Sequence, residues 1–207
     1  MKKLTLKLFS LSFLLFITAC TKDRVADPST LNTPQSVLYS ESFDETSISA
    51  PALPAGWTTT PDSGWVNDST NFSTGYDGAS GNRNLVTTND SLSSNDCVLM
   101  SKSISTTGYN KTSVTYGARR SKHFSDNGSS ISSFAYSIDN GVNWINLPYT
   151  ENTNDSNWYL INNTVRITLS DDASNQASLK FRWVAHKVPT PSGTYRIDDF
   201  QILGTAM

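Results

Sequence analysis

The sequence predicts an all-β protein, a jelly-roll β-sandwich, from its composition and from the spacing of its apolar residues. Ser, Thr and Asn number 31, 24 and 18 of 207 residues, and such residues favour turns and strands over helix interiors. Apolar residues come in short alternating bursts, and no stretch after residue 20 keeps a helical period. Many short strands with polar turns between them are typical of a sandwich or jelly roll.

Eight segments are predicted to form strands, because apolar residues alternate in them or form a compact run. Between the fourth and the fifth segment, Asp139-Asn140-Gly141 predicts a hairpin turn. In chain order the segments are 37–43, 97–104, 114–118, 134–138, 144–147, 165–169, 179–185 and 195–203.

Residues 57–96 differ from the rest, because they are rich in Gly, Asn, Asp and Ser with isolated aromatic residues. We expect one long connection there, and such loops are usually functional or held by a ligand or metal. Trp65, Tyr76 and Trp158 lie in polar segments and are the predicted ligand-binding residues, since aromatic rings can stack on sugars. The alternative is that these rings are core residues, as we expect for Trp144 and Trp183.

The closing strand contains a break in its alternation. Tyr195 and Ile197 share one parity and Phe200 and Ile202 the other, so the apolar phase slips at Asp198-Asp199. Such a slip predicts a β-bulge, which re-aims side chains. Two adjacent carboxylates at a bulge can reach one point, as a hard cation requires. The alternative is that both acids cap an edge and face water.

The N-terminus has the anatomy of a secretory signal. Three lysines precede an apolar run that is too short to span a bilayer as a helix. Ile17-Thr18-Ala19-Cys20 resembles the lipobox of bacterial lipoproteins, in which the cysteine is lipidated, and an uncleaved anchor helix is the alternative. The predicted parts are a signal peptide at 1–19, the lipidated Cys20 with a flexible tether at 20–36, and the sandwich domain at 37–207.

Charge and motifs limit the function classes. Without the signal peptide the chain has 13 basic and 18 acidic residues, a net charge of −5, which argues against nucleic-acid binding. Cys97 would be the remaining thiol, and its apolar neighbours favour a buried hydrophobe over a nucleophile. Neither His123 nor His186 lies in a metal-ligand or hydrolase motif, and no Gly-x-Ser-x-Gly is present. We therefore do not expect an enzyme.

Several motifs follow one another along the chain: Glu41-Ser42-Phe43-Asp44, Leu53-Pro54-Ala55-Gly56-Trp57-Thr58, the Ser-x-Asp-x-Gly turn followed by Trp at 137–144, Leu179–Trp183 and Tyr195–Phe200. Taken in this order, they resemble the cleaved-adhesin and choice-of-anchor-J family of Bacteroidetes. The resemblance implies a jelly roll that binds glycans or proteins, often with structural calcium. Carried over by position, the calcium ligands are Glu41, Asp44, Asp198 and Asp199. A second calcium site is not expected, because the loop after Gly-Trp is only 61–65.

These inferences together predict a lipid-anchored binding or adhesion module at the outer membrane, with a glycan or a surface protein as its partner. Thr21-Lys22-Asp23 resembles the short charged signals that send some Bacteroidetes lipoproteins to the cell surface. The alternatives are an accessory subunit of an outer-membrane complex, or a glycan-active hydrolase. Asp68-Ser69-Thr70 and Asp90-Ser91-Leu92 resemble the O-glycosylation sequon of Bacteroidetes.

Overall fold

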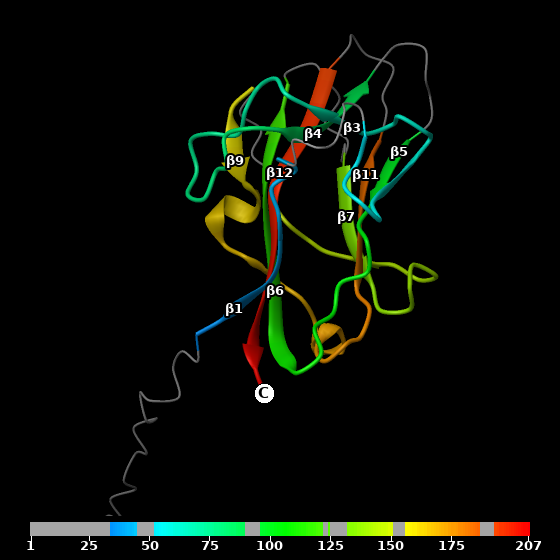
Figure 1. The fold of residues 1–207 in the computed structure, drawn as a ribbon, viewed down its shortest axis with the longest axis vertical. Coiled ribbons are helices and arrows are strands. Elements are labelled where there is room, and N and C mark those ends of the chain that lie inside the picture. The colour runs from blue at the N-terminus through cyan, green and yellow to red at the C-terminus, as the bar shows by residue number, and fades with distance from the viewer. Residues whose placement is uncertain are drawn as a thin grey trace, which may run out of the picture. The chain divides into compact units, whose positions relative to one another are not determined.

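A computed structural model describes most of the chain as a β-sandwich of two antiparallel sheets (Figure 1). The described residues all belong to one compact unit, Thr33–Met207. Across the described residues no helix has the length and apolar character needed to cross a membrane. The described ranges are 34–44, 52–89, 96–121, 124, 132–150, 156–186 and 193–207.

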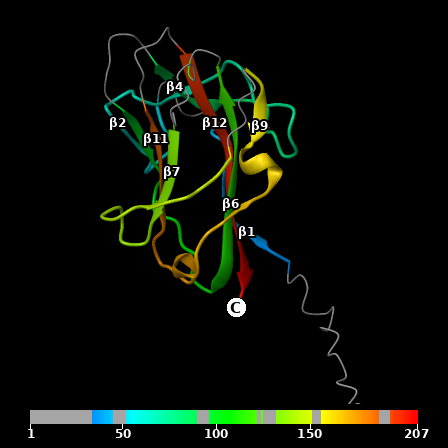
Figure 2. The ribbon, with the colours of Figure 1, turned by 180° about the vertical axis from the view of Figure 1, so that it is seen from behind.

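The first sheet has seven strands and is built around β6 and β12, which run side by side along the molecule (Figures 1 and 2). Its order is β10-β6-β12-β4-β3, with β1 paired to β12 and β9 paired to β6. The strands are β1 (Ser36–Glu41), β3 (Val66–Asp68), β4 (Asn84–Asn89), β6 (Tyr109–Arg120), β9 (Trp158–Leu160), β10 (Ile167–Thr168) and β12 (Gly193–Ala206).

The second sheet has five strands in the order β2-β5-β11-β7-β8. Figure 2 shows β7 and β11 together in this second layer. The strands are β2 (Thr58–Thr60), β5 (Cys97–Met100), β7 (Ser132–Ser137), β8 (Ile145–Asn146) and β11 (Lys180–Ala185). Two short 3-10 helices connect strands, η3 (Ile161–Thr164) and η4 (Asp171–Ala173).

An aromatic core lies between the sheets. Phe134 of β7 stacks on Trp183 of β11 with ring centroids 4.8 Å apart, and Phe200 of β12 meets Trp183 edge-on at 5.0 Å. Each such pair adds about 0.5–1.5 kcal/mol beyond the area that it buries. The first contact lies within the five-stranded sheet, and the second crosses to the seven-stranded sheet and so helps to fix the spacing of the two layers. The arrangement confirms the predicted all-β sandwich and the core position of Trp183.

The β7–β8 hairpin shows why the predicted turn forms. Asn140 and Gly141 both have positive φ, 63° and 93°, and Asp139 Oδ1 accepts the N–H groups of Val142 and Asn143 at 3.1 and 2.8 Å. These bonds, first that from the Asn143 N–H, together with one from the Ser137 hydroxyl, lower the pKa of Asp139 to about 2. The hairpin prediction is confirmed.

Residues 57–96 are not one long connection, contrary to the sequence prediction. They contain β2, β3 and β4, and β4 pairs with the closing strand β12. The sequence did not reveal β2 and β3 because each has three residues, too few for an alternating pattern of apolar side chains. The true connection is the shorter segment 69–83 between β3 and β4.

The predicted bulge in the closing strand is confirmed. In the pairing of β12 with β6, Asp198 faces Gly117 and Gln201 faces Thr115, so two residues of β12 stand against one of β6. Asp199 takes a left-handed φ of 51°. The opening strand β1 pairs with β12 directly after this bulge, from Glu41 opposite Phe200 onward.

Candidate ligand-binding groove

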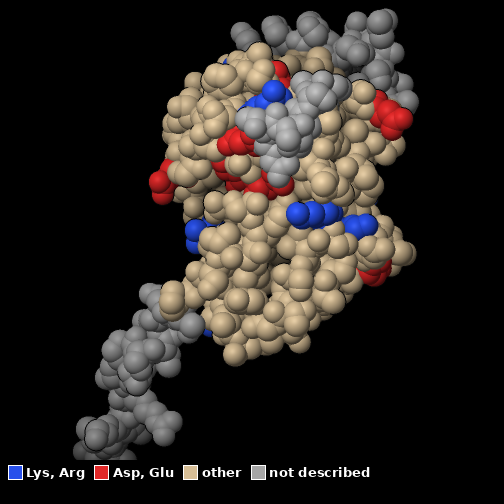
Figure 3. Space-filling view, viewed as in Figure 1, with Lys and Arg blue, Asp and Glu red and all other residues tan. Residues whose placement is uncertain are grey.

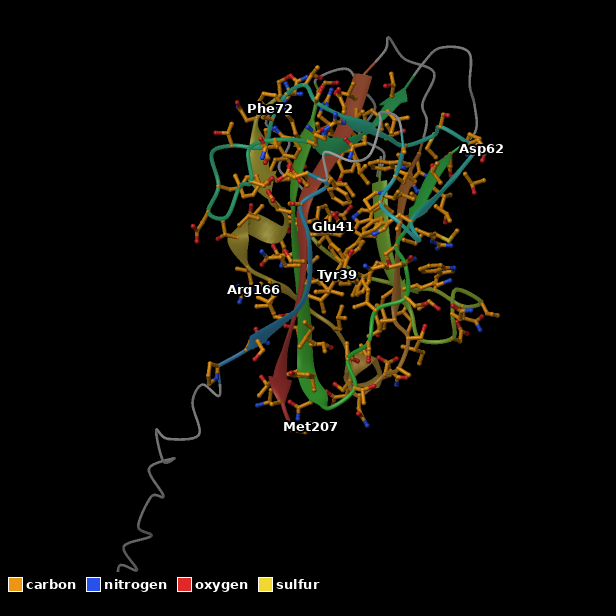
Figure 4. The ribbon with its side chains drawn as sticks, in the orientation of Figure 1. Tyr39, Glu41, Asp62, Phe72, Arg166 and Met207 are labelled. Carbon is orange, nitrogen blue, oxygen red and sulfur yellow. The ribbon has the colours of Figure 1, made fainter. Side chains whose placement is uncertain are left out.

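A groove of about 1220 Å³ lies on the outer face of the seven-stranded sheet. Residues from strands β6, β9, β10 and β12 line it, together with η3, the segment before β1 and the tip of the 69–83 connection. Arg166 stands on the flank of the molecule beyond β9 and η3 (Figure 4). The lining residues are Gln35, Gly75, Tyr76, Asp77, Gly78, Ser113, Thr115, Trp158, Tyr159, Leu160, Asn163, Thr164, Val165, Arg166, Thr168, Asp199 and Gln201.

The floor of the groove is polar and uncharged. Ser113 and Thr115 alternate along β6 with buried Val114 and Tyr116, so their hydroxyls face away from the core. Gln201 lies opposite Thr115 across the β6–β12 pair. Within the described part of the chain, the side chains of Thr115 and Gln201 make no hydrogen bond to protein groups. These groups are therefore free to donate to and accept from a ligand.

One end of the groove is closed by Tyr76. Its hydroxyl donates to Asp199 Oδ2 at 2.5 Å, and its ring faces Trp158 with centroids 6.4 Å apart. The ring lies directly over Gly117 of β6, where a Cβ would collide with the Tyr76 phenol. Only glycine gives the ring this close approach to the strand. Burial, followed by the bond to Asp199, raises the pKa of the Tyr76 phenol.

The connection that contains Tyr76 is fixed to the sheet by several partly buried hydrogen bonds. Trp158 Nε1 donates to the carbonyl of Asn71 at 2.9 Å. The carbonyl of Thr70 accepts from Asn84 Nδ2 at 2.9 Å and from the Arg196 guanidinium at 3.1 Å. The segment is therefore an ordered roof over the upper part of the sheet and not a free loop.

An ion pair supports this roof from below. Arg196 of β12 is buried and donates to Asp68 Oδ2 at 2.5 Å and to Asn84 Oδ1 at 2.7 Å. Burial alone would raise the pKa of Asp68, but bonds from Thr70 and Arg196 and the charge of Arg196 lower it below 3.8. The pair holds the start of the connection, residues 68–70, against the strand.

A cluster of carboxylates lies behind the Tyr76 end. Asp198 is fully buried and accepts the Asp199 N–H at 2.8 Å. Burial, the charge of Asp199 and the charge of Asp44 raise the pKa of Asp198 to about 8. Asp44 accepts the backbone N–H of Arg83 at 2.7 Å, and Asp199 accepts the N–H of Ser80 at 3.2 Å. Acidic side chains gather on the upper half of the face seen in Figure 3.

The structure brings together three of the four predicted metal ligands, since Asp44, Asp198 and Asp199 belong to this cluster. Glu41 is engaged elsewhere, because its carboxylate accepts the Tyr39 hydroxyl at 2.9 Å and the Phe43 N–H at 3.1 Å. Figure 4 shows Tyr39 and Glu41 on β1. Over the described ranges, no three His, Cys, Asp or Glu side chains converge closely enough to hold a metal ion.

Two of the three predicted aromatic ligand residues line the groove, Tyr76 and Trp158. Trp65 does not, because it is 1% exposed and its Nε1 donates into the core to the Cys97 carbonyl at 3.2 Å. A ring enclosed in the core presents no face to a ligand. Sequence reasoning missed the floor residues and Gly117, whose one visible signal was a glycine inside a predicted strand.

Other predicted features have definite positions. Cys97 is buried, which confirms its interpretation as a small core residue. His186 forms an exposed pair with Asp96 at 2.9 Å. Asp68, which belongs to the first predicted sequon, forms an ion pair with Arg196. Cys20, His123 and the second sequon lie outside the described residues.

Comparisons with solved structures return cleaved adhesin domains and a xylan-binding domain. The K3 cleaved adhesin domain of Lys-gingipain from Porphyromonas gingivalis is 16% identical with a TM-score of 0.49, covering 82% of this chain and 99% of that one. The K1 domain of the same protein is 14% identical with a TM-score of 0.45, covering 79% of this chain and 96% of that one. The CBM22-1 xylan-binding domain of Paenibacillus barcinonensis Xyn10C is 18% identical with a TM-score of 0.48, covering 83% of this chain and 96% of that one.

No curated protein matches the sequence. The family model of Reelin subrepeat B matches residues 62–203, from the loop after β2 to the closing strand β12. This match covers well over half of the chain, including the connection that carries Tyr76 and the bulge of β12. The chain belongs to the Reelin subrepeat B family.

Proposed function

We propose that this protein is a binding module and that the groove on its seven-stranded sheet holds a glycan. The observation that carries the proposal is one groove that combines an aromatic end wall with an uncharged polar floor. Sugars present hydroxyls around the ring edge and C–H groups on the ring face. The floor at Thr115 and Gln201 suits the hydroxyls, and an aromatic ring such as that of Tyr76 suits the ring face.

The size and charge of the groove support a glycan over a small charged ligand. Its volume of about 1220 Å³ is larger than the roughly 300–1,000 Å³ of small-molecule pockets. The charged residues that line it are Arg166, Asp77 and Asp199, and Asp199 is already bonded to Tyr76. A neutral oligosaccharide therefore matches the lining better than a strongly charged metabolite does. The proposal is binding without catalysis.

A glycan panel with the purified full-length protein tests the proposal. We expect at least one neutral glycan to bind, and Gln201→Ala or Thr115→Val to weaken that binding about two- to tenfold, as loss of one hydrogen bond would. Asp62→Asn is the control, because Asp62 is exposed and lies on the side of the molecule away from Arg166 (Figure 4). Binding to no glycan, with a stable protein complex recovered instead, would favour the accessory-subunit alternative.

Calcium at Asp44, Asp198 and Asp199 stays a prediction that requires these carboxylates to come closer together than they lie in the structure, and one observation favours it. Asp198 is buried beside two other carboxylates, and within the described chain none of the three has a Lys or Arg side chain in ion-pair distance. Oxygen-rich, anionic surroundings of this kind suit Ca²⁺. We expect CaCl₂ to raise the melting temperature relative to EDTA, with MgCl₂ as the control. An unchanged melting temperature would reject the calcium site.

We also propose that binding takes place at the outer membrane, through lipid on Cys20. Support comes from the lipobox-like Ile17-Thr18-Ala19-Cys20 and the short apolar run before it. Cys20→Ser should move the protein from the membrane fraction to the soluble or unprocessed fraction, and should abolish labelling by a fatty-acid probe. Retention of the label in Cys20→Ser would contradict lipidation at this cysteine.

A further inference from the structure

We infer that the groove recognises the end of a glycan chain and not an internal segment, because the Tyr76 end of the groove is walled off. This inference rests on the proposed function and names the ligand class more narrowly. Along β6 the outward positions are Ser113, Thr115 and then Gly117, which lies beneath Tyr76. The floor thus runs about 13 Å along the strand from the wall to the opposite end.

The wall is in direct contact with the sheet. A Cβ on Gly117 would come within 2.9 Å of Tyr76 Cε1 and still closer to its hydroxyl. A glycan chain is far thicker than a methyl group, so no chain can pass between the ring and the strand. The contact also explains a glycine in the middle of a twelve-residue strand, where glycine costs stability.

The wall is also held in place by hydrogen bonds. The Tyr76 hydroxyl is bonded to Asp199, and Ser80 donates its N–H to the same carboxylate oxygen at 3.2 Å. Gly81 N–H donates to Ser73 Oγ at 3.0 Å, which closes the connection on itself around Tyr76. Swinging the ring aside would remove one of the two hydrogen bonds to the buried Asp199 carboxylate, which is costly.

The opposite end has a different character. Gln35 bonds to the Lys111 carbonyl at 2.8 Å and accepts the Ser113 hydroxyl at 3.3 Å, so it lies low against the floor. Gln35 and Lys111 are both exposed at this end. A chain can therefore extend outward past Gln35 but must end at Tyr76. The terminal sugar would lie beside the Tyr76 ring, with its hydroxyls near Thr115 and Gln201.

The test is the number of protein molecules bound per glycan chain as the chain grows. The glycan that binds best in the panel is used as purified linear oligosaccharides of increasing length, and titration calorimetry gives the stoichiometry. Recognition of a chain end keeps one protein per chain at every length. A stoichiometry that rises with length would overturn the inference while leaving the proposed function intact, whereas no binding at any length would reject both.

Variants of the wall sharpen the test. Tyr76→Ala removes the barrier, so we expect about tenfold weaker binding of the shortest oligosaccharide and more than one protein per long chain. Tyr76→Phe keeps the ring over Gly117 and should keep one protein per chain. Gly117→Ala should displace the ring and behave like Tyr76→Ala. Gly204→Ala is its control, because Gly204 is a crowded glycine of β12, where a Cβ would come within 2.9 Å of Leu38 and 3.0 Å of Tyr109, outside the groove.

Each variant result bears on the inference. A Tyr76→Ala protein that still binds one molecule per long chain would contradict the role of Tyr76 as the barrier. Loss of binding in Gly204→Ala equal to that in Gly117→Ala would show a general packing effect and would also count against it. If Tyr76→Ala does not fold, the stoichiometry of the unmodified protein and of Tyr76→Phe decides the question alone.

Discussion

The outer faces of the two sheets are built in opposite ways. On the seven-stranded sheet, the connection between β3 and β4 folds back over the strands and buries polar groups such as Arg196, Asn84 and Asp198. On the five-stranded sheet, the β7–β8 hairpin satisfies its own polar groups through Asp139, and Arg182 stacks on Trp144 at 4.5 Å. A walled groove arises on the first face because a segment is fixed over it.

This difference has an energetic side. Each buried polar group under the connection needs a partner, since a lost partner leaves a group that water cannot reach. The network is therefore cooperative, and removal of one member should loosen the whole roof. On the five-stranded sheet, water can replace the exposed hydrogen-bond partners of Asp139 when one of them is lost. The expected effects of substitutions on the two faces differ accordingly.

The largest expected effect is the contrast between two arginines that face outward from neighbouring layers. Arg196→Ala should lower the free energy of unfolding by about 3 kcal/mol, because it leaves Asp68 and Asn84 without their buried partner. Arg182→Ala should cost about 1 kcal/mol, the loss of one cation–π contact and its packing. Denaturant unfolding of both variants measures the difference. Equal losses would contradict the contrast between the faces.

A smaller effect is expected from the pH dependence of the Asp68–Arg196 pair. The pKa of Asp68 is lowered in the folded protein, so its ionised form stabilises the fold above the unfolded pKa near 3.8. That contribution is lost as the pH falls through the folded pKa. Asp68→Asn should therefore be less stable than the unmodified protein at pH 7, with a gap that narrows below about pH 4. A gap that is constant between pH 7 and pH 3 would contradict this assignment.

The smallest effect is expected in the β7–β8 hairpin. Asp139 is exposed, and its pKa of about 2 reflects local bonds from the Asn143 N–H and the Ser137 hydroxyl. Asp139→Asn should lower the melting temperature slightly above pH 4, and the difference should shrink as the pH falls toward 2, where the native carboxylate is about half protonated. Glycan binding should be unaffected, because the hairpin does not line the groove. Weakened glycan binding in this variant would indicate that the binding site lies on the five-stranded sheet instead.

Sequence patterns predicted the long strands and the bulge because a strand shows as a local alternation of apolar residues and the bulge as a break in that alternation. Alternation over five or more residues located β6, β7, β11 and β12, and the phase slip at Asp198-Asp199 located the bulge to the residue. The strands β2, β3 and β9 have three residues each and offer no period to detect. β4 was missed because its polar threonines and asparagines resemble those of a loop.

The aromatic residues show where prediction from sequence patterns fails for single side chains. Trp65 and Trp158 both lie in polar segments of the sequence, yet Trp65 is enclosed in the core and Trp158 lines the groove. The difference depends on the partners that the fold supplies, the Cys97 carbonyl for one ring and the Asn71 carbonyl for the other. Neither partner is adjacent in sequence, so no local pattern can separate the two tryptophans.

The sequence by itself determined the all-β class, the core position of Cys97, the hairpin turn at Asp139–Gly141 and the bulge, because each depends on neighbouring residues or on composition. Only the tertiary structure decided that Tyr76 lies over Gly117 and is bonded to Asp199. Those residues are 41 and 123 positions from Tyr76, and the contact exists because β6 and β12 are paired beneath a folded-back connection. The groove and its wall follow from that long-range pairing.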